Sequence, residues 1–168
     1  TTAWVKAKYY RNRVLSWFFD WTDNIPLPSR GFLLSQEFLR SAGRLPTDAE
    51  YRWLRDDVDG TLADPTPLDG ELARLVGGAH PTAADVARFR DGFERRFDEL
   101  MAEVTRLTRR AFELGLNVLV FPQGTRSKHL PRGLTGLAQM AQHLGTTIVP
   151  VGSNGSDRLY PTFSPFSK

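Results

Sequence analysis

Residues 121–129, FPQGTRSKH, gather groups that suit the binding of a phosphate. Gly124 lets a ligand approach the backbone closely, and Arg126 carries a planar fork that can hold two phosphate oxygens at once. The further polar groups of this stretch are Gln123, Thr125, Ser127 and Lys128. We therefore predict a phosphate or other oxyanion site here. The alternative is an ordinary polar loop that follows a strand and binds nothing.

Two apolar runs and a helical pattern flank this stretch. Residues 116–121 and 147–151 are apolar runs typical of buried strands, and residues 132–144 have apolar positions on one helical face, with Gly145 as the expected cap. Strand, helix and strand at this spacing predict a βαβ unit with parallel strands. The predicted fold class is α/β, with a central, mostly parallel sheet flanked by helices. Ligands of such sheets bind beyond the carboxyl ends of the strands, where residues 122–129 would lie.

At 168 residues the chain is expected to form a single domain, 1–168, with a helical insertion at 44–115. Prolines and glycines break residues 44–81, and a long amphipathic helix is predicted over 83–114 and capped by Gly115. The other expected elements are a strand or extended stretch at 3–10, helices at 11–21 and 32–42, an edge strand or extended loop around Pro26 and Pro28, and short helices at 48–56 and 69–76.

The composition narrows the classes of function. There is no cysteine, and the three histidines lack metal-ligand spacing, so we expect no metal site. The net charge is +3, but residues 43–80 hold four arginines against eight acids, which is −4, so the remainder is +7. A basic body suggests an anionic partner such as phosphate groups or a membrane surface, and no nucleic acid, because RNA-module signatures are absent. An ordinary solvated surface is the alternative.

The order of residues in the loop carries a family resemblance. The block FPQGTRS resembles the FPEGTRS block of the glycerolipid acyltransferases, a family that includes lysophosphatidate and glycerol-3-phosphate acyltransferases. Residues 131–155 resemble the arginine-glycine, helix and "PIVPV" blocks that follow it, and residues 3–31 resemble an upstream block that ends in arginine-glycine. The resemblance covers about 1–36 and 116–160 and leaves 44–115 unexplained.

The resemblance implies roles for individual residues. Arg30 and Arg126 would hold the phosphate of the acyl acceptor, with Gln123, Gly124, Thr125 and Ser127 shaping the same site. Pro122, Gly133 and Pro150 would be structural or would line the acyl channel. Gln123 stands where the family has Glu, so it carries no charge to pair with either arginine.

The family's catalytic His and Asp, which have four residues between them, belong to a block that precedes the one at 3–31. That pair is therefore expected before Thr1, and the chain is expected to be a truncated domain with no catalytic residue of its own. His80 and Asp85 have the same separation, but Thr82 and Asp85 form a capping-box pattern that opens the long helix. We interpret Asp85 as a capping residue, with a relocated catalytic pair as the alternative.

Seven aromatic residues lie within residues 1–21, together with Arg11 and Arg13. Such a segment suits an interfacial membrane anchor. The alternative is a helix that packs on the sheet and leaves a few aromatic rings at the rim.

The resemblance implies acyl transfer from an acyl-CoA or acyl-carrier-protein thioester to a phosphate-bearing glycerolipid such as lysophosphatidate, in phospholipid biosynthesis. It implies no bound cofactor, with the acyl thioester as co-substrate. The partners would be a glycerophospholipid acceptor and a membrane surface, with the protein at the cytoplasmic face of the membrane. A non-catalytic phospholipid-binding or regulatory module on the same fold is the alternative.

Overall fold

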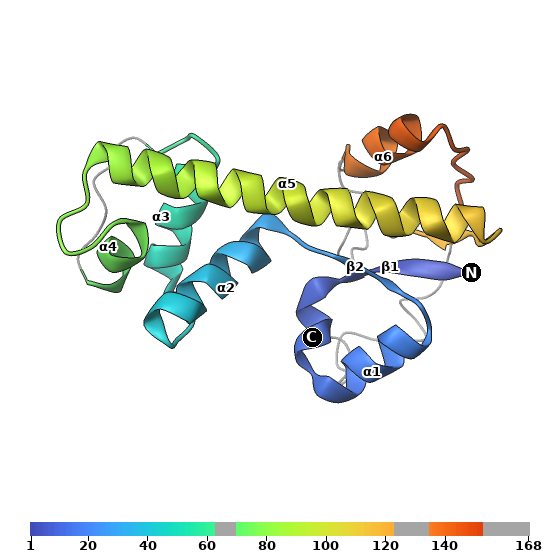
Figure 1. Cartoon of the computed structure of the whole chain (residues 1–168), viewed down its shortest axis with the longest axis horizontal. Coiled ribbons are helices and arrows are strands. Elements are labelled where there is room, and N and C mark those ends of the chain that lie inside the picture. The colour runs from blue at the N-terminus through green and yellow to red at the C-terminus, as the bar shows by residue number, and fades with distance from the viewer. Residues whose placement is uncertain (63–69, 123–134, 153–168) are drawn as a thin grey trace. The chain divides into compact units, whose positions relative to one another are not determined.

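The computed structural model describes residues 1–62, 70–122 and 135–152. The chain divides into two compact units, Thr1–Leu119 and Val120–Lys168. The first unit holds a small parallel sheet and most of the helices (Figure 1). The second unit holds the described helix α6, Gly136–Leu144. The α/β class predicted from the sequence is confirmed, whereas a single domain with an insertion at 44–115 stays a prediction.

The sheet has the order β2-β1-β3, with β1 (Thr2–Lys6) in the centre. β2 (Ile25–Leu27) and β3 (Val118–Leu119) both run parallel to β1. Pro26 lies in β2 opposite Val5, and β2 is an edge strand, which is where a residue without an N–H is tolerated. Between β1 and β2 the chain forms a 3-10 helix, η1 (Ala7–Arg11), and the helix α1 (Arg13–Trp21).

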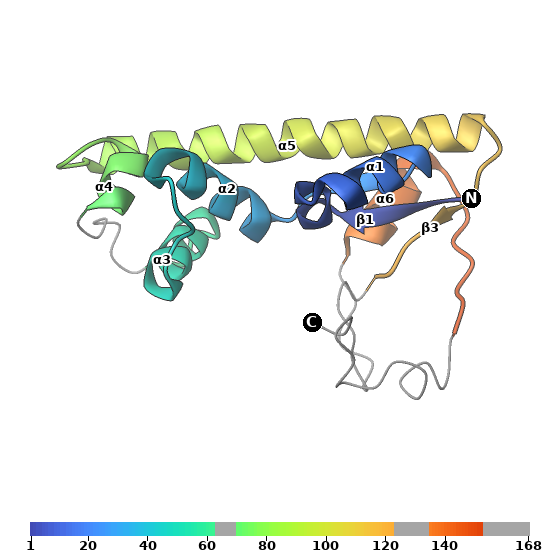
Figure 2. The ribbon, with the colours of Figure 1, turned by 90° about the horizontal axis from the view of Figure 1, so that it is seen from below.

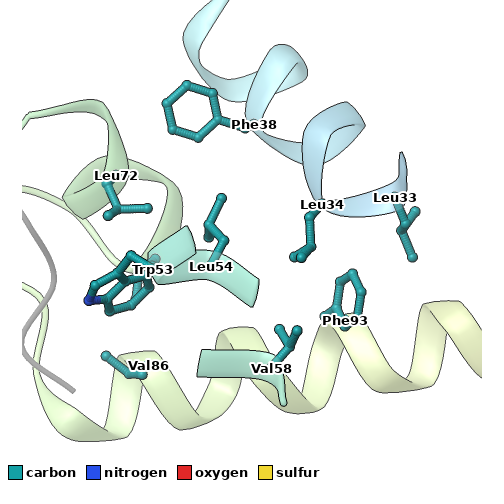
Figure 3. Packing of buried hydrophobic residues seen from close by; sticks show 10 residues of the cluster. Leu33, Leu34, Phe38, Trp53, Leu54, Val58, Leu72, Val86 and Phe93 are labelled. Carbon is teal, nitrogen blue, oxygen red and sulfur yellow. The ribbon is translucent and has the colours of Figure 1, made fainter. Parts of the chain in front are cut away.

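A separate helical core lies beside the sheet. It is built from α2 (Arg30–Ala42), α3 (Asp48–Val58), α4 (Glu71–Val76) and the N-terminal part of α5 (Ala83–Glu113). Leu34, Phe38, Leu54 and Leu72 are almost completely buried there (Figure 3). Phe93 of α5 belongs to the same cluster (Figure 3). The short helices predicted at 48–56 and 69–76 are therefore confirmed, with slightly different bounds.

Helix α5 runs along both parts of the first unit (Figure 2). Its 31 residues extend about 46 Å at 1.5 Å per residue. Thr82 and Asp85 form the predicted capping box, and Gly115 follows the helix in the left-handed region at φ 71°. Towards its C-terminal end, buried Thr108 accepts a hydrogen bond of 3.1 Å from the indole Nε1 of Trp4, which ties α5 to β1.

Two of the predicted buried strands are corrected by the structure. Of residues 116–121 only Val118–Leu119 form a strand, and Leu119 and Phe121 are 45% and 69% exposed. Residues 147–151 form no strand, and Val149 and Val151 are more than three-quarters exposed. Apolar runs become buried strands only when other strands pair with them and a layer covers them. Here β3 pairs on one side only, with β1, and 147–151 pair with no described strand.

The helix predicted between these runs is present as α6, shorter at its start than the predicted 132–144. It ends as expected at Gly145, whose φ is 62°. The predicted βαβ unit of the last third is therefore present as one short strand and one helix, without the second strand.

Truncating Leu54 tests the helical core. Leu54 is fully buried, so Leu54→Ala removes apolar contacts and leaves a cavity. We expect the free energy of unfolding to fall by about 2–5 kcal/mol. Leu114→Ala is the control, because Leu114 is 58% exposed and should change stability by no more than about 0.5 kcal/mol. Urea unfolding followed by circular dichroism measures both; equal effects would contradict the assigned core.

The ion pair at the start of α3 predicts a pH dependence. Arg44 donates two hydrogen bonds to Glu50, and Glu50 also accepts from the backbone N–H of Thr47, which together lower the Glu50 pKa from 4.5 to about 2. A lowered folded pKa stabilises the fold above the unfolded pKa, and this stabilisation is lost as the pH falls towards 2. As the pH is lowered from 4.5 to about 2, the melting temperature of the native chain should fall more steeply than that of the Glu50→Gln variant. Parallel curves would contradict the assigned pair.

Candidate functional site

The loop that the sequence singles out is only partly within the described residues. Pro122 is exposed and lies in a turn after β3. Gln123, Gly124, Thr125, Arg126, Ser127, Lys128 and Gly133 lie outside the described residues. Pro150 is exposed and belongs to the second unit. The phosphate-binding roles of the loop residues and the structural or acyl-channel roles of Pro122, Gly133 and Pro150 therefore stay predictions.

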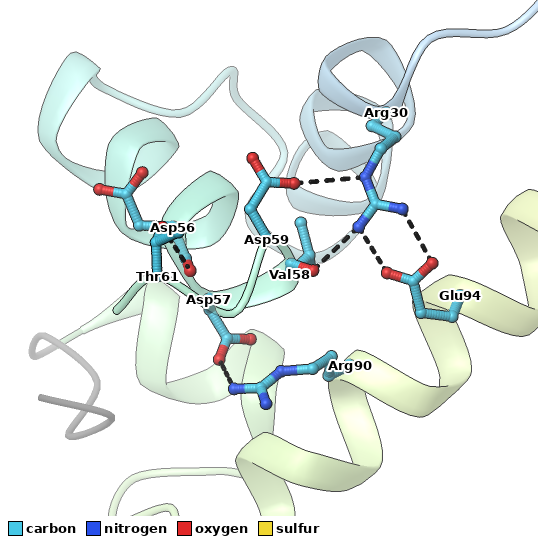
Figure 4. Close-up of polar contacts among 8 residues, drawn as sticks. All are labelled: Arg30, Asp56, Asp57, Val58, Asp59, Thr61, Arg90 and Glu94. Carbon is cyan, nitrogen blue, oxygen red and sulfur yellow. Dashed lines mark hydrogen bonds and ion pairs between the residues drawn. The ribbon is translucent and has the colours of Figure 1, made fainter. Parts of the chain in front are cut away.

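Arg30, the other predicted phosphate ligand, lies at the start of α2. Ser29 caps this helix by accepting a hydrogen bond from the backbone N–H of Phe32. The Arg30 side chain turns towards α5, where its two terminal nitrogens donate to the carboxylate of Glu94 at 2.8 and 2.5 Å (Figure 4). It also donates to the carbonyl of Val58 at 2.9 Å. One guanidinium thus joins α2, α3 and α5.

Further contacts hold this guanidinium in place. Its Nε lies 3.4 Å from a carboxylate oxygen of Asp59, and its plane lies over the rings of Phe93 and Phe97. The hydrogen bonds to Glu94 raise the pKa of Arg30 above its ordinary value. Arg30 is therefore a permanent cation with two carboxylate partners in this structure. A phosphate would have to displace or share these carboxylates, so the ligand role of Arg30 stays a prediction.

Glu94 and Asp59 are the residues of this cluster that sequence reasoning missed. Asp59 belongs to the acidic segment 43–80, which has a net charge of −4 beside a basic body. That charge imbalance suggested an external anion for the body. The structure shows that part of the acidic segment pairs with the body's own Arg30. The uneven distribution of charge was the signal in the sequence for these ion pairs, but it did not identify Asp59 or Glu94 as the partners of Arg30.

A second pair lies beside this cluster. Asp57 of α3 is completely buried, and one of its carboxylate oxygens accepts a hydrogen bond of 2.5 Å from Arg90 of α5. Its other oxygen has no hydrogen-bond partner within the described residues. A buried charge is costly unless it is paired, and Arg90 supplies the partner of Asp57. The pair fixes how α3 sits on α5, and nothing in its surroundings suggests a catalytic role.

The interpretation of Asp85 as a capping residue is confirmed. Its carboxylate accepts hydrogen bonds from the backbone N–H and the hydroxyl of Thr82, at 2.9 and 2.7 Å. These bonds, with a further one from Arg88, lower the pKa of Asp85. His80 makes no hydrogen bond or ion pair with Asp85 among the described contacts. A carboxylate used in this way is not free to orient an imidazole.

An open groove of about 800 Å³ lies between the η1–α1 segment and α2. Apolar and aromatic side chains of Leu15, Phe32 and Tyr51 line it, and Lys8 and Arg11 also line it. Gly31 also lines the groove, and a Cβ at this position would collide with the Tyr51 hydroxyl. The combination of apolar walls with two cations suits an amphipathic anion, and sequence reasoning did not identify it.

The comparisons with known proteins point to one family. Residues 80–154 match the family model described as Acyltransferase. No curated protein and no solved structure matches the chain. The matched segment contains α5, the whole FPQGTRS block and Pro150, so it also covers residues 80–115, which the resemblance had left unexplained. The match covers somewhat less than half of the chain, and within residues 80–154 the chain is similar to the acyltransferase family.

Proposed function

We propose that this protein is an acyltransferase, and that it moves an acyl group from an acyl-CoA or acyl-carrier-protein thioester to the hydroxyl of a phosphate-bearing glycerolipid such as lysophosphatidate. The observation that carries the proposal is the FPQGTRS block inside the family match. Its glycine, hydroxyls and arginine are the groups that bind a phosphate. The donor and acceptor would meet in phospholipid biosynthesis at the cytoplasmic face of a membrane, with no bound cofactor.

The chemistry follows from the groups involved. The acceptor hydroxyl oxygen attacks the thioester carbonyl, the carbon–sulfur bond breaks, and an ester and a free thiol result. The hydroxyl proton passes to a His held by an Asp and then to the leaving sulfur. In this proposal the His and Asp belong to the block that the resemblance implies before residues 3–31. The loop at 123–127 holds the acceptor phosphate, so that its hydroxyl is presented to the imidazole.

The described structure supports an anionic, amphipathic acceptor. The groove beside α2 combines apolar walls with Lys8 and Arg11. None of the helices among the described residues is both long and apolar enough to cross a bilayer.

Replacing Arg126 tests the phosphate site. In the protein that carries the His/Asp block, Arg126→Ala removes a charge-assisted contact with the acceptor phosphate. We expect the acceptor KM to rise about ten- to a hundredfold while the donor KM changes little. Arg110→Ala is the matched control, because exposed Arg110 pairs only with nearby Glu113 among the described ion pairs. Unchanged acceptor kinetics in Arg126→Ala would remove the assigned role.

The competition between Glu94 and a phosphate for Arg30 gives a second test. Glu94→Gln weakens the hold on the Arg30 guanidinium, so the free energy of unfolding should fall by about 1 kcal/mol. If Arg30 also binds the acceptor phosphate, the acceptor KM should fall several-fold in the same variant. Glu103→Gln, which affects only the exposed pair with Arg106, is the control. A loss of stability with no change in KM would show that Arg30 is purely structural.

One observation favours a second candidate function, a phospholipid-binding or regulatory module without turnover. Gln123 replaces the Glu of the family block, and the carboxylate that would pair with an arginine is therefore missing. Radiolabelled acyl transfer by the protein with its His/Asp block distinguishes the two. Turnover excludes the binding module, whereas lysolipid binding without turnover supports it.

A further inference from the structure

Helix α1 presents an apolar face that the first unit leaves uncovered. Val14, Trp17 and Trp21 are 73%, 67% and 71% exposed, and Phe18 is 44% exposed. On an ideal helix these four positions fall within an arc of about 100°. Large aromatic side chains are seldom exposed together on one face without a partner.

This face is the outer side of a helix that is itself held in place. Asn12 caps α1 by accepting hydrogen bonds from the backbone N–H groups of Val14 and Leu15. Phe19, on the inner side, packs against the ring of Tyr10, whose hydroxyl donates to the carbonyl of Asn24 at the start of β2. No residue of α1 is fully buried. The exposed rings therefore do not belong to the hydrophobic core of this unit.

The exposed aromatic rings of α1 lie against one another and form a continuous aromatic surface. Trp17 and Trp21 are stacked, with ring centroids 6.3 Å apart and planes within 5° of parallel. Phe18 lies beside Trp21. Stacking of this kind keeps both indoles on the same side of the helix, where each can present its ring to an apolar medium and its N–H to water.

Four cations lie next to this face. Lys6, Lys8, Arg11 and Arg13 are exposed and follow one another within eight residues that contain no acid. None of them pairs with a described carboxylate. Most other described arginines of the first unit form ion pairs with carboxylates, as Arg30, Arg44 and Arg90 do. This cluster therefore keeps its charge available for an external anion.

We propose that α1 is an interfacial helix that lies on a bilayer rich in anionic lipid. Val14, Trp17, Phe18 and Trp21 would enter the boundary between headgroups and acyl chains, and the four cations would contact the lipid phosphates. Tryptophan prefers this boundary, and nine residues are too few to span a membrane. The proposal deepens the proposed function, on which it rests for the reason why the chain meets lipid.

The position of the groove is consistent with a bilayer lying against α1. Lys8, Arg11 and Leu15 belong both to the η1–α1 segment and to the wall of the open groove. A helix lying on lipid would bring that groove to the membrane surface. A lipid with a phosphate headgroup would then pass from the bilayer into the groove without crossing water.

Vesicle binding of the purified chain tests the proposal. The vesicles hold equal parts of phosphatidylglycerol and phosphatidylcholine, and a second set has bromine atoms in the acyl chains. We expect the chain to sediment with the vesicles and its tryptophan fluorescence to be quenched by bromine. Trp17→Ser with Trp21→Ser should lower partitioning by at least about tenfold. It should also abolish the quenching, because Trp4 and Trp53 remain within the fold.

Leu114→Ser is the matched control, because Leu114 is an exposed apolar residue on another element. It should bind vesicles like the native chain. If the double tryptophan variant does not fold, Val14→Asp replaces it. That change puts a charge in the centre of the face, at a helix start where an acid is favourable. Leu114→Asp is then the control.

The cations are tested with Arg11→Gln combined with Arg13→Gln. We expect partitioning into the anionic vesicles to fall by about tenfold or more, and binding to lose much of its salt dependence. Unchanged binding in this variant would overturn the role of the headgroups. Unchanged binding after the tryptophan or Val14 substitutions would overturn the role of the apolar face.

Two further outcomes would also overturn the proposal. The native chain could fail to bind these vesicles, or it could form dimers that the tryptophan variant disperses while binding no lipid. The second result would assign the face to another copy of the chain. None of these readings needs turnover. If the protein with its His/Asp block does not transfer an acyl group to a water-soluble acceptor, the proposed function is refuted. The vesicle-binding assay would still decide the role of α1.

Discussion

The first unit depends on the burial of one long amphipathic helix. Helix α5 has apolar side chains along its whole length. With 31 residues, it extends beyond the helical core and also packs against the sheet. Its N-terminal half meets α2, α3 and α4, where Val86 and Phe93 join the helical core. Its C-terminal half meets the sheet, where Val104, Thr108 and Ala111 are buried. Two assemblies that would otherwise be independent therefore share one element.

The polar contacts across α5 add specificity to this burial. Arg30 and Arg90 connect α2 and α3 to fixed positions on the helix, through Glu94 and the buried Asp57. Apolar packing alone tolerates small shifts of one helix along another, whereas a bidentate arginine–carboxylate pair does not. The same geometry explains why Arg30 faces α5 in this structure. Any phosphate that recruits this guanidinium acts on the packing between α2 and α5 at the same time.

Local signals in the sequence predicted most helices well. Thr82 with Asp85, and Gly115, mark the two ends of α5, and Gly43 marks the end of α2. These signals depend on neighbouring residues only, so they can be recognised without the fold. The strands were harder, because an apolar run such as 147–151 resembles a buried strand whether or not a partner strand and a covering layer exist. The partners of Arg30 were out of reach for the same reason, since Glu94 is 64 residues away in sequence. For the loop at 123–127 the sequence remains the only guide.

The central place of β1 has a consequence for the order of folding. Thr2 pairs with Val118, more than a hundred residues later in the sequence, whereas every residue of the helical core cluster lies between Leu33 and Phe97. During synthesis the helical cluster can collapse as soon as α5 begins to emerge, but the pairing of β1 with β3 has to wait for more than a hundred residues. Contacts so distant in sequence form slowly, because a large loop must close first. Strand β1 and the aromatic helix α1 therefore stay without the β1–β3 pairing while the helical cluster is already compact, and the apolar face of α1 is accessible to other molecules during that interval.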